Sequence, residues 1–315
     1  MSRRDFLKIA INTVAASLTL PACQAAYTAV PKASLQSSPT SPPPTIIPAA
    51  TPTLRPAQIP VTIHGSEMWN MVSQANGQKY RILVSSPRVK ADVPFPVIYI
   101  TDGNGNLPLL HVLHSNLVDD GYLPPALLVG VDYPFDEWSD YEALRGHDFT
   151  PTTLIGNFAY KDYFSAGTGG APLFLQFLRD ELKPAINARY NTLLDDATLT
   201  GHSLGGLFAL YALFQAPSLF QRYVIGSPSI FFDNKSILNS LDTFANTNTD
   251  LPARVFMGVG GNEPSVVPDM LALEDMLTGY GYPSLRLSTR VFENETHLSM
   301  ISFFLSIGLR AVFDS

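Results

Sequence analysis

From about residue 61 onward, the chain alternates short apolar runs with longer helix-like stretches. The runs lack the polar–apolar alternation of a half-exposed strand, so they predict strands buried on both faces, as in a parallel sheet. These predicted buried strands cover residues 96–100, 126–131, 198–200, 223–225 and 255–259, with a last strand at 285–292. The predicted helices cover residues 107–119, 171–189, 204–215 and 268–280, with a closing helix from about residue 298. This alternation predicts an α/β fold with a mostly parallel central sheet and helices on both faces.

Two earlier segments predict an antiparallel hairpin. Residues 67–73 and 79–85 flank the pair Asn76-Gly77, which favours a tight turn between strands. No internal repeat and no further proline-rich linker divides the region 61–315. Its length of about 255 residues suits one α/β domain.

The first 23 residues have the features of an export signal. Arg3 and Arg4 precede a moderately apolar stretch at residues 9–20, which is shorter than the roughly 20 residues that span a bilayer. The stretch ends in Leu-Pro-Ala immediately before Cys23, and this arrangement resembles the lipobox of bacterial lipoproteins. We therefore expect a twin-arginine-type lipoprotein signal peptide at 1–23, with the mature chain lipid-anchored through Cys23 to the outer face of a bacterial membrane. The alternative is a chance cysteine in a signal peptide that is cleaved elsewhere.

Residues 24–60 predict a disordered segment. Nine prolines and many serines and threonines fall within residues 31–60, where Lys32 and Arg55 are the only charged side chains. Such a composition has too little apolar surface to offset the entropy of ordering. The segment is interpreted as a tether between the predicted anchor and the domain, or as a leader with no particular role.

Charge and cysteine content exclude some classes of function. The 315 residues carry a formal net charge of −7, so the chain lacks the basic footprint of a nucleic-acid-binding protein. Cys23 is the only cysteine. The chain therefore forms neither an intramolecular disulfide nor a cysteine-rich metal site.

The segment Gly201-His202-Ser203-Leu204-Gly205 is the strongest chemical signal in the sequence. It follows a predicted strand and begins a predicted helix, which is the context of a nucleophile elbow. In such a turn, the flanking glycines permit close backbone approach, and the serine projects above the sheet edge. The pattern predicts Ser203 as the nucleophile and the Leu204 N–H as one oxyanion-hole donor.

A serine nucleophile needs a base, and His297 is the best candidate among six histidines. It follows the last predicted strand, in agreement with the chain order Ser, acid, His of this fold. His202 is adjacent to Ser203, so its side chain is expected to point away from the nucleophile. His111 and His114 have helical spacing but no carboxylate or cysteine cluster, so we expect no metal site there. His147 is expected in a loop.

The acid is predicted to be Glu263. It is the first carboxylate after the predicted strand 255–259, where the acid of this fold usually lies. Asp269 is its rival, although a carboxylate at the start of the following helix is also explained by the helix dipole.

The second oxyanion donor is expected just after the predicted strand 96–100. There the sequence continues Thr101-Asp102-Gly103-Asn104, and the glycine allows the chain to fold back. We predict the N–H of Asn104, or alternatively that of Gly103, as this donor.

At these residues the chain resembles the branch of the α/β-hydrolases called putative esterases, which includes esterase D and the trilactone esterases that open ferric siderophores. The serine turn and the segment ending at His297 take part, together with GQKYRI at 77–82, VIYITDGN at 97–104, VGVDYP at 129–134, RGHDFTP at 145–151, GGA at 169–171 and GSPS at 226–229. The resemblance implies an α/β-hydrolase fold and a serine esterase that works through an acyl-enzyme, without a cofactor, on a small-molecule ester such as a siderophore. It also suggests Arg145 and Ser227 as substrate-binding residues. Arg145 is expected to meet an anionic group or to order the rim of the pocket, with an ion pair to Asp148 as the alternative.

Two other functions are compatible with the same residues. In acyl transfer of the mycolyl-transfer type, a sugar hydroxyl replaces water as the acceptor. In a non-catalytic lipoprotein, the scaffold binds a siderophore or glycan, although the presence of both Ser203 and His297 favours catalysis.

Overall fold

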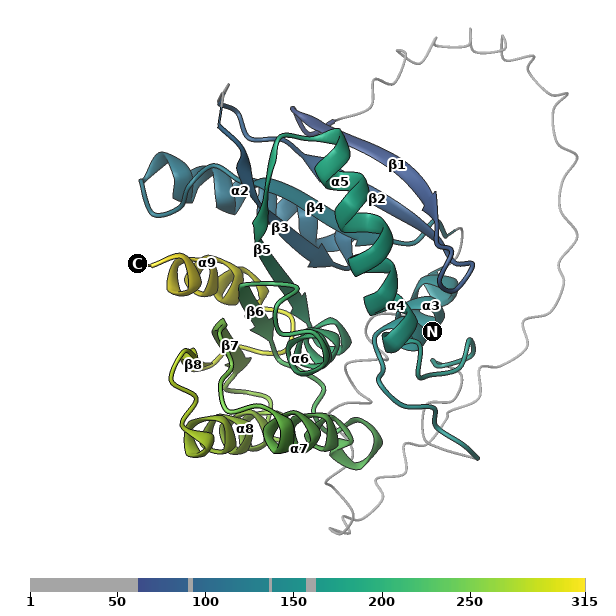
Figure 1. Ribbon diagram of the computed structural model, residues 1–315, viewed down its shortest axis with the longest axis vertical. Helices are drawn as coiled ribbons and strands as arrows, with labels where there is room; N and C mark the ends of the chain where they lie inside the picture. The colour runs from purple at the N-terminus through teal and green to yellow at the C-terminus, as the bar shows by residue number, and fades with distance from the viewer. Residues whose placement is uncertain (1–61, 90–92, 136–137, 157–162, 315) are drawn as a thin grey trace, which may run out of the picture. The chain divides into compact units, whose positions relative to one another are not determined.

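The computed structural model describes residues 62–314 except 90–92, 136–137 and 157–162, and a single sheet runs through this part of the chain (Figure 1). The eight strands are β1 (Ser66–Val72), β2 (Lys79–Ser85), β3 (Phe95–Thr101), β4 (Leu127–Asp132), β5 (Thr192–His202), β6 (Arg222–Gly226), β7 (Arg254–Gly260) and β8 (Arg286–Phe292). Their order across the sheet is β1-β2-β4-β3-β5-β6-β7-β8. β2 pairs antiparallel with both β1 and β4, and all other pairs are parallel. The predicted mostly parallel α/β sheet is confirmed.

The predicted hairpin is also present. β1 and β2 pair from Ser66↔Ser85 to Val72↔Lys79, so the turn contains Asn76-Gly77. Gly77 has φ of 73°, a backbone conformation that is readily available to glycine. Predictions for residues 1–60, including the lipid anchor on Cys23, lie outside the described part of the chain.

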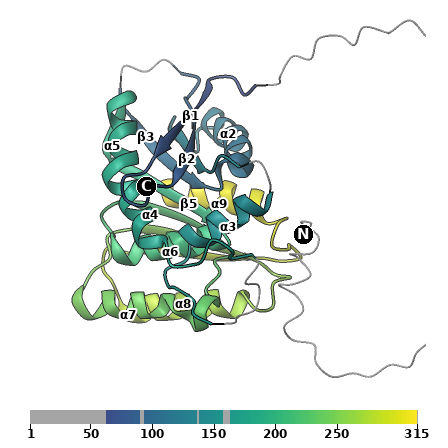
Figure 2. The same ribbon diagram turned by 90° about the vertical axis from the view of Figure 1, so that its right-hand side faces the viewer.

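Helices cover both faces of the sheet. α2 (Gly103–Asp119) and α9 (Ile301–Phe313) pack on one face, and α2 and α5 lie on opposite sides of the sheet (Figure 2). The other face is covered by α4 (Ala171–Phe177), α5 (Lys183–Arg189), α6 (Leu204–Gln215), α7 (Ile237–Thr247) and α8 (Val267–Tyr280). Alternate strand residues supply the two cores: Val255 and Met257 point to one face and Phe256 to the other. This burial on both faces explains why the strands are continuous apolar runs.

Four elements differ from the sequence expectation. The helix predicted at 171–189 contains a π-helical segment, Leu178–Leu182, between α4 and α5. α3 (Trp138–Asp148) and α7 were not predicted, and a 3-10 turn, Phe232–Lys235, precedes α7. His147 therefore lies in the last turn of α3, and its placement in a loop is wrong. Within the described residues, no helix has both the length and the apolar character needed to cross a membrane.

Candidate active site

Ser203 lies in a sharp turn between β5 and α6. Its backbone has φ of 62° and ψ of −120°, a conformation that is strained for a residue with a side chain. The Ser203 N–H donates to the carbonyl of Gly226 at 2.9 Å, which ties the turn to the end of β6. A Cβ atom at Gly201 would overlap the backbone of Gly205, so the turn closes only with glycine there. These features have the geometry expected of a nucleophile elbow.

Leu204 is the first residue of α6. The first N–H groups of a helix have no acceptor within the helix, and the N-terminus carries partial positive charge. The carbonyl of Ser203 accepts the N–H of Leu207 at 3.0 Å, so the helix begins directly at the serine. This arrangement is suited to stabilising negative charge that develops beside Ser203.

His297 lies next to Glu263, across the carboxyl ends of neighbouring strands. The Glu263 Oε2 atom is 2.5 Å from His297 Nδ1. Two backbone hydrogen bonds join the loops after β7 and β8, because Gly261 donates to Phe292 at 2.8 Å and Asn262 donates to Glu295 at 2.9 Å. The parallel pairing of β7 with β8 therefore brings together side chains that are 34 positions apart.

The Glu263 carboxylate has further partners on its other oxygen. Oε1 accepts the Ser227 hydroxyl at 2.6 Å and the Gly260 N–H at 2.9 Å. Asp269, the rival acid, lies in the first turn of α8, where its carboxylate pairs with Lys235 at 2.7 Å. The structure thus places Glu263, and not Asp269, beside His297.

The imidazole ring of His202 packs against that of His297. The two ring centroids are 4.4 Å apart, and the ring planes are inclined at 50°. Burial holds the pKa of His202 well below its usual range, and the neighbouring His297 and the positive charge of Arg145 lower this pKa further. His202 is therefore neutral at neutral pH. It contacts the predicted base by packing.

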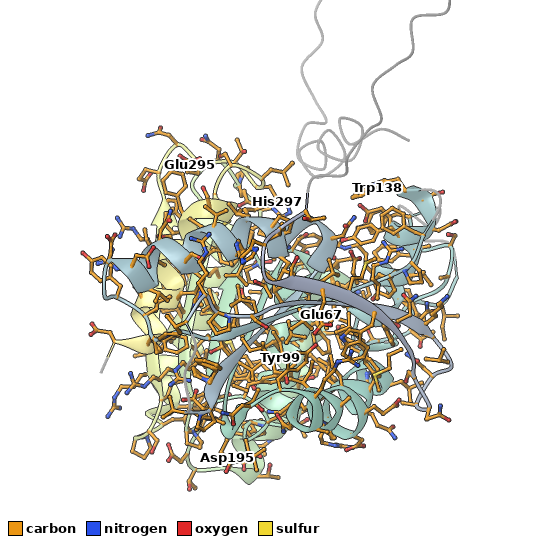
Figure 3. The ribbon with its side chains drawn as sticks, turned by 90° about the horizontal axis from the view of Figure 1, so that it is seen from above. Glu67, Tyr99, Trp138, Asp195, Glu295 and His297 are labelled. Atoms are coloured by element: carbon orange, nitrogen blue, oxygen red, sulfur yellow. The ribbon has the colours of Figure 1, made fainter. Side chains whose placement is uncertain are left out.

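All these groups lie at one edge of the sheet. Figure 3 shows His297 and Trp138 along one side of the molecule and Asp195, in the first half of β5, on the opposite side. Ser203, Glu263 and His297 each follow a strand, so they gather at the carboxyl edge of the parallel sheet. Open α/β sheets place their ligand sites at this edge.

The turn after β3 differs from the sequence expectation. α2 begins directly at Gly103, and the Asn104 N–H donates to Asp132 Oδ2 at 2.7 Å. Asp132 ends β4, which lies on the far side of β3 from β5 and Ser203. The prediction that the Asn104 N–H is available to an oxyanion is therefore wrong for this conformation, because a carboxylate already accepts it. Gly103, the alternative, packs against the backbone of Gly130 so closely that a Cβ would lie 2.8 Å from its carbonyl carbon.

Asp132 is a buried acid that the sequence analysis did not single out. Its Oδ1 accepts the Tyr133 N–H at 2.8 Å, and its side chain is inaccessible to solvent. Burial raises the pKa of Asp132 to about 6, and the negative charge of Asp102 contributes to this increase. A single aspartate at the end of an apolar run gave no signal of this environment.

The two suggested substrate-binding residues have other contacts. The Arg145 guanidinium is buried against Asp102, with Nε 2.8 Å from Oδ1 and Nη2 3.0 Å from Oδ2. The alternative pair with Asp148 does not occur, since Arg145 pairs with Asp102 and Asp148 accepts the hydroxyls of Tyr80 and Tyr133. Ser227 is fully buried, and its hydroxyl donates to Glu263 as described above. Its assignment to substrate binding is therefore corrected to a contact with Glu263, the predicted acid.

Three other histidines have local partners. His111 Nδ1 lies 2.7 Å from the Ser85 hydroxyl, and His114 Nε2 lies 3.2 Å from the carbonyl of Pro124. Burial lowers the pKa of His114 to about 4. His147 Nδ1 is 2.8 Å from Asp148. Within the described ranges, no cluster of three or more His, Cys, Asp or Glu side chains is arranged to hold a metal ion.

Comparisons with known proteins find a matching family and several relatives. The model of the family described as "Putative esterase" matches residues 73–236. The chain is 29% identical over 261 residues to the ferri-bacillibactin esterase BesA of Bacillus subtilis (strain 168), covering 79% of this chain and 90% of BesA. It is 33% identical over 196 residues to the siderophore triacetylfusarinine C esterase of Aspergillus fumigatus, covering 60% and 64% of the two chains. The crystal structure of the BES protein from Bacillus cereus superposes with a TM-score of 0.74 at 31% identity, over 82% of this chain and all of that one.

Proposed function

Because the chain belongs to the putative esterase family, we propose that it cleaves carboxylic esters by a serine mechanism, with siderophore-type esters as its substrates. The observation that carries the serine mechanism is the 2.5 Å contact between His297 and Glu263 at the sheet edge where Ser203 forms its strained turn. A nucleophile, a base and an orienting carboxylate at one edge are the components of a catalytic triad.

In the proposed reaction, the Ser203 hydroxyl attacks the ester carbonyl carbon while His297 accepts its proton. Glu263 holds the imidazole in the required orientation and stabilises the imidazolium that forms. The Leu204 N–H donates to the oxyanion. Collapse of the tetrahedral intermediate expels the alcohol, which takes the proton from His297, and leaves an acyl-enzyme on Ser203. Water, deprotonated by His297, then releases the acid and regenerates the serine.

The substrate class rests on the relatives. Two of them are named for esters of siderophores, ferri-bacillibactin and triacetylfusarinine C. Acyl transfer to an alcohol uses the same residues, so a product assay must separate it from hydrolysis. We propose comparing ferric trilactone esters with simple esters, each with and without an added sugar acceptor. A new ester product in the presence of the sugar would indicate transfer, and release of the free acid alone would indicate hydrolysis.

Substitution of the nucleophile tests the serine mechanism. We expect Ser203→Ala to lower the turnover of an activated ester by on the order of 10⁴ to 10⁶, because loss of a triad member removes the covalent route. The wild-type protein should react with a fluorophosphonate, and the mass of the adduct should map to Ser203. Ser218→Ala is the matched control, since Ser218 lies between α6 and β6 at the other edge of the sheet. If the Ser203 variant retains more than about a tenth of the wild-type rate, the assigned nucleophile is wrong.

The N-terminal segment supports a proposal about location. We propose that the enzyme is exported and lipid-anchored through Cys23, on the basis of the arginine pair, the short apolar stretch and the position of the single cysteine. Mass spectrometry of protein from membranes should find an acylated Cys23 as the first residue, and Cys23→Ser should abolish cleavage at that site. An unmodified N-terminus downstream of residue 23 would contradict the anchor without affecting the catalytic proposal.

A further inference from the structure

We propose that Arg145 is a positioning residue for the oxyanion side of the active site. It acts through Asp102, which precedes the first turn of α2 and lies beside the serine turn. The inference rests on the proposed serine mechanism, because it assigns a purpose to the surroundings of the nucleophile.

Arg145 and Asp102 form a buried, bidentate ion pair. The two nitrogens of the guanidinium fork contact the two carboxylate oxygens at 2.8 and 3.0 Å. The Tyr141 hydroxyl donates to the same carboxylate at 2.5 Å, and Arg145 Nη1 donates to the Tyr163 hydroxyl at 2.6 Å. Arg145 and Asp102 are each only 7% exposed. Such an arrangement fixes orientation more strictly than a single point contact does.

Asp102 has a backbone conformation that requires support. Its φ of 56° and ψ of 46° lie in the left-handed region, which disfavours residues with a side chain. From this conformation, its carbonyl accepts the N–H groups of Gly105 at 3.1 Å and Asn106 at 3.0 Å, and so begins α2. The direction of the Gly103 N–H, the remaining candidate for the second oxyanion donor, therefore depends on how Asp102 is held.

The pair also lies against the serine turn. A Cβ atom at Gly205 would be only 3.4 Å from Asp102 Oδ2, so this carboxylate contacts the first turn of α6. The positive charge of Arg145 also acts on His202, because it helps to lower the pKa of that imidazole. The carboxylate of Asp102 is thus close to the place where the proposed oxyanion develops.

Two consequences follow for catalysis. First, loss of the fork frees Asp102 to leave its left-handed conformation and moves the start of α2. Second, loss of the Arg145 charge leaves a carboxylate without its cation beside a developing oxyanion, and like charges repel. Both effects raise the energy of the transition state more than that of the bound ester, so kcat should fall while KM changes little.

The test measures kcat and KM separately for four variants on one activated ester, together with the rate of fluorophosphonate labelling. We expect Arg145→Met to lower kcat by on the order of 10², similar to the loss of an oxyanion donor, with KM within about threefold of wild type. Arg145→Lys keeps the positive charge without the guanidinium fork, and its kcat should fall by about tenfold. The double variant Arg145→Met/Asp102→Asn should recover part of the kcat that Arg145→Met loses, because it also removes the unpaired carboxylate. Tyr141→Phe removes one hydrogen bond to Asp102 and should reduce kcat a few-fold.

Arg222 provides the matched control. It pairs with Asp196 between β5 and β6 toward the starts of the strands, so Arg222→Met removes an arginine–aspartate pair far from the serine. This variant should lose thermal stability with kcat unchanged. If the Arg145 variants lose only stability, or if KM rises with kcat intact, the positioning role is overturned. If Arg145→Met and Arg145→Lys both fail to fold, Tyr141→Phe decides, and unchanged kcat in that variant overturns the proposal. Absence of hydrolysis and labelling in the wild type would instead refute the serine mechanism.

Discussion

The two sides of the active site are built from interactions of different range. On the side of β5, β7 and β8, the serine turn closes within five residues, and His297 meets Glu263 through loops that follow adjacent parallel strands. On the side of β3 and β4, the start of α2 is held by side chains from other elements. Arg145 is 43 positions from Asp102, and Asp132 is 28 positions from Asn104.

This difference explains which features the sequence reveals. A turn that needs glycines at set positions leaves a recognisable pattern, and a parallel strand order restricts where the acid and the base lie. A buried ion pair between a turn and a distant helix leaves no such pattern. The proposed triad side is therefore more readily predicted than the oxyanion side, and the following variants test whether the two sides also differ in their effects.

The largest expected effect concerns Glu263, the proposed acid. Glu263→Gln removes the negative charge that contacts His297, so the imidazole loses both its orientation and the stabilisation of its protonated form. We expect turnover of an activated ester to fall by up to about 10⁴. The measurement is steady-state hydrolysis by protein whose folding is verified by circular dichroism.

Asp269→Asn is the matched control for that experiment. Asp269 pairs with Lys235 in the first turn of α8, while Glu263 holds the position beside His297, so this variant should keep almost all activity. A large loss in the Asp269 variant alone would transfer the acid role to that residue. Small losses in both would indicate that Ser203 and His297 act as a dyad.

Most of the fold was predictable from apolar patterning. All eight strands and the helices α2, α6, α8 and α9 lie where the pattern placed them, within a few residues, except that β5 starts six residues earlier than expected. That early part of β5 is largely exposed, with Leu194 at 64%, so it carries no buried-strand pattern. α3 was missed because its eleven residues include five charged or histidine side chains, and much of its burial comes from polar contacts.

The arrangement of the candidate site was predictable where backbone geometry determines it. Ser203, Leu204, Glu263 and His297 lie in the positions that chain order requires. The contacts of Asn104, Arg145 and Ser227 were not predictable, because each depends on a partner supplied by tertiary packing. Asp132 is the clearest case, since its identity in the sequence says nothing about its complete burial.

The second expected effect concerns Asp132 and the dependence of stability on pH. Its pKa is raised from 3.8 to about 6 in the folded protein, so the folded state binds the proton more tightly than the unfolded state. The stability that this group contributes is therefore fully present below about pH 4 and is lost as pH rises through about 6. Asp132→Asn cannot titrate, so the free energy of unfolding, variant minus wild type, should increase across this window by up to about 3 kcal/mol.

Urea denaturation at several pH values between about 4 and 7, at constant ionic strength, measures this difference. Asp195→Asn is the control, because Asp195 is exposed near the start of β5. A variant curve that runs parallel to that of the wild type would show that Asp132 does not titrate in this range. Asp132 would then not give the side of β3 and β4 a buried carboxylate with a raised pKa, and this difference from the side of β5, β7 and β8 would disappear.

The smallest expected effect concerns Ser227, whose hydroxyl contacts the proposed acid, Glu263. Its hydroxyl donates to Glu263 Oε1 at 2.6 Å, and the Gly260 N–H donates to the same oxygen at 2.9 Å. Ser227→Ala removes one of these two donors and leaves the other, so the carboxylate remains held but less strictly. A lost hydrogen bond of this kind costs about 1.4 kcal/mol, which corresponds to about a tenfold decrease in kcat. The matched test is the same substitution in the Glu263→Gln background, where it should have almost no further effect, because Ser227 acts through the carboxylate. A full tenfold loss in that background would show that Ser227 acts on the substrate directly and not through Glu263. The Ser227 hydroxyl would then be a substrate-binding group that exchanges its hydrogen bond to Glu263 for one to the bound ester.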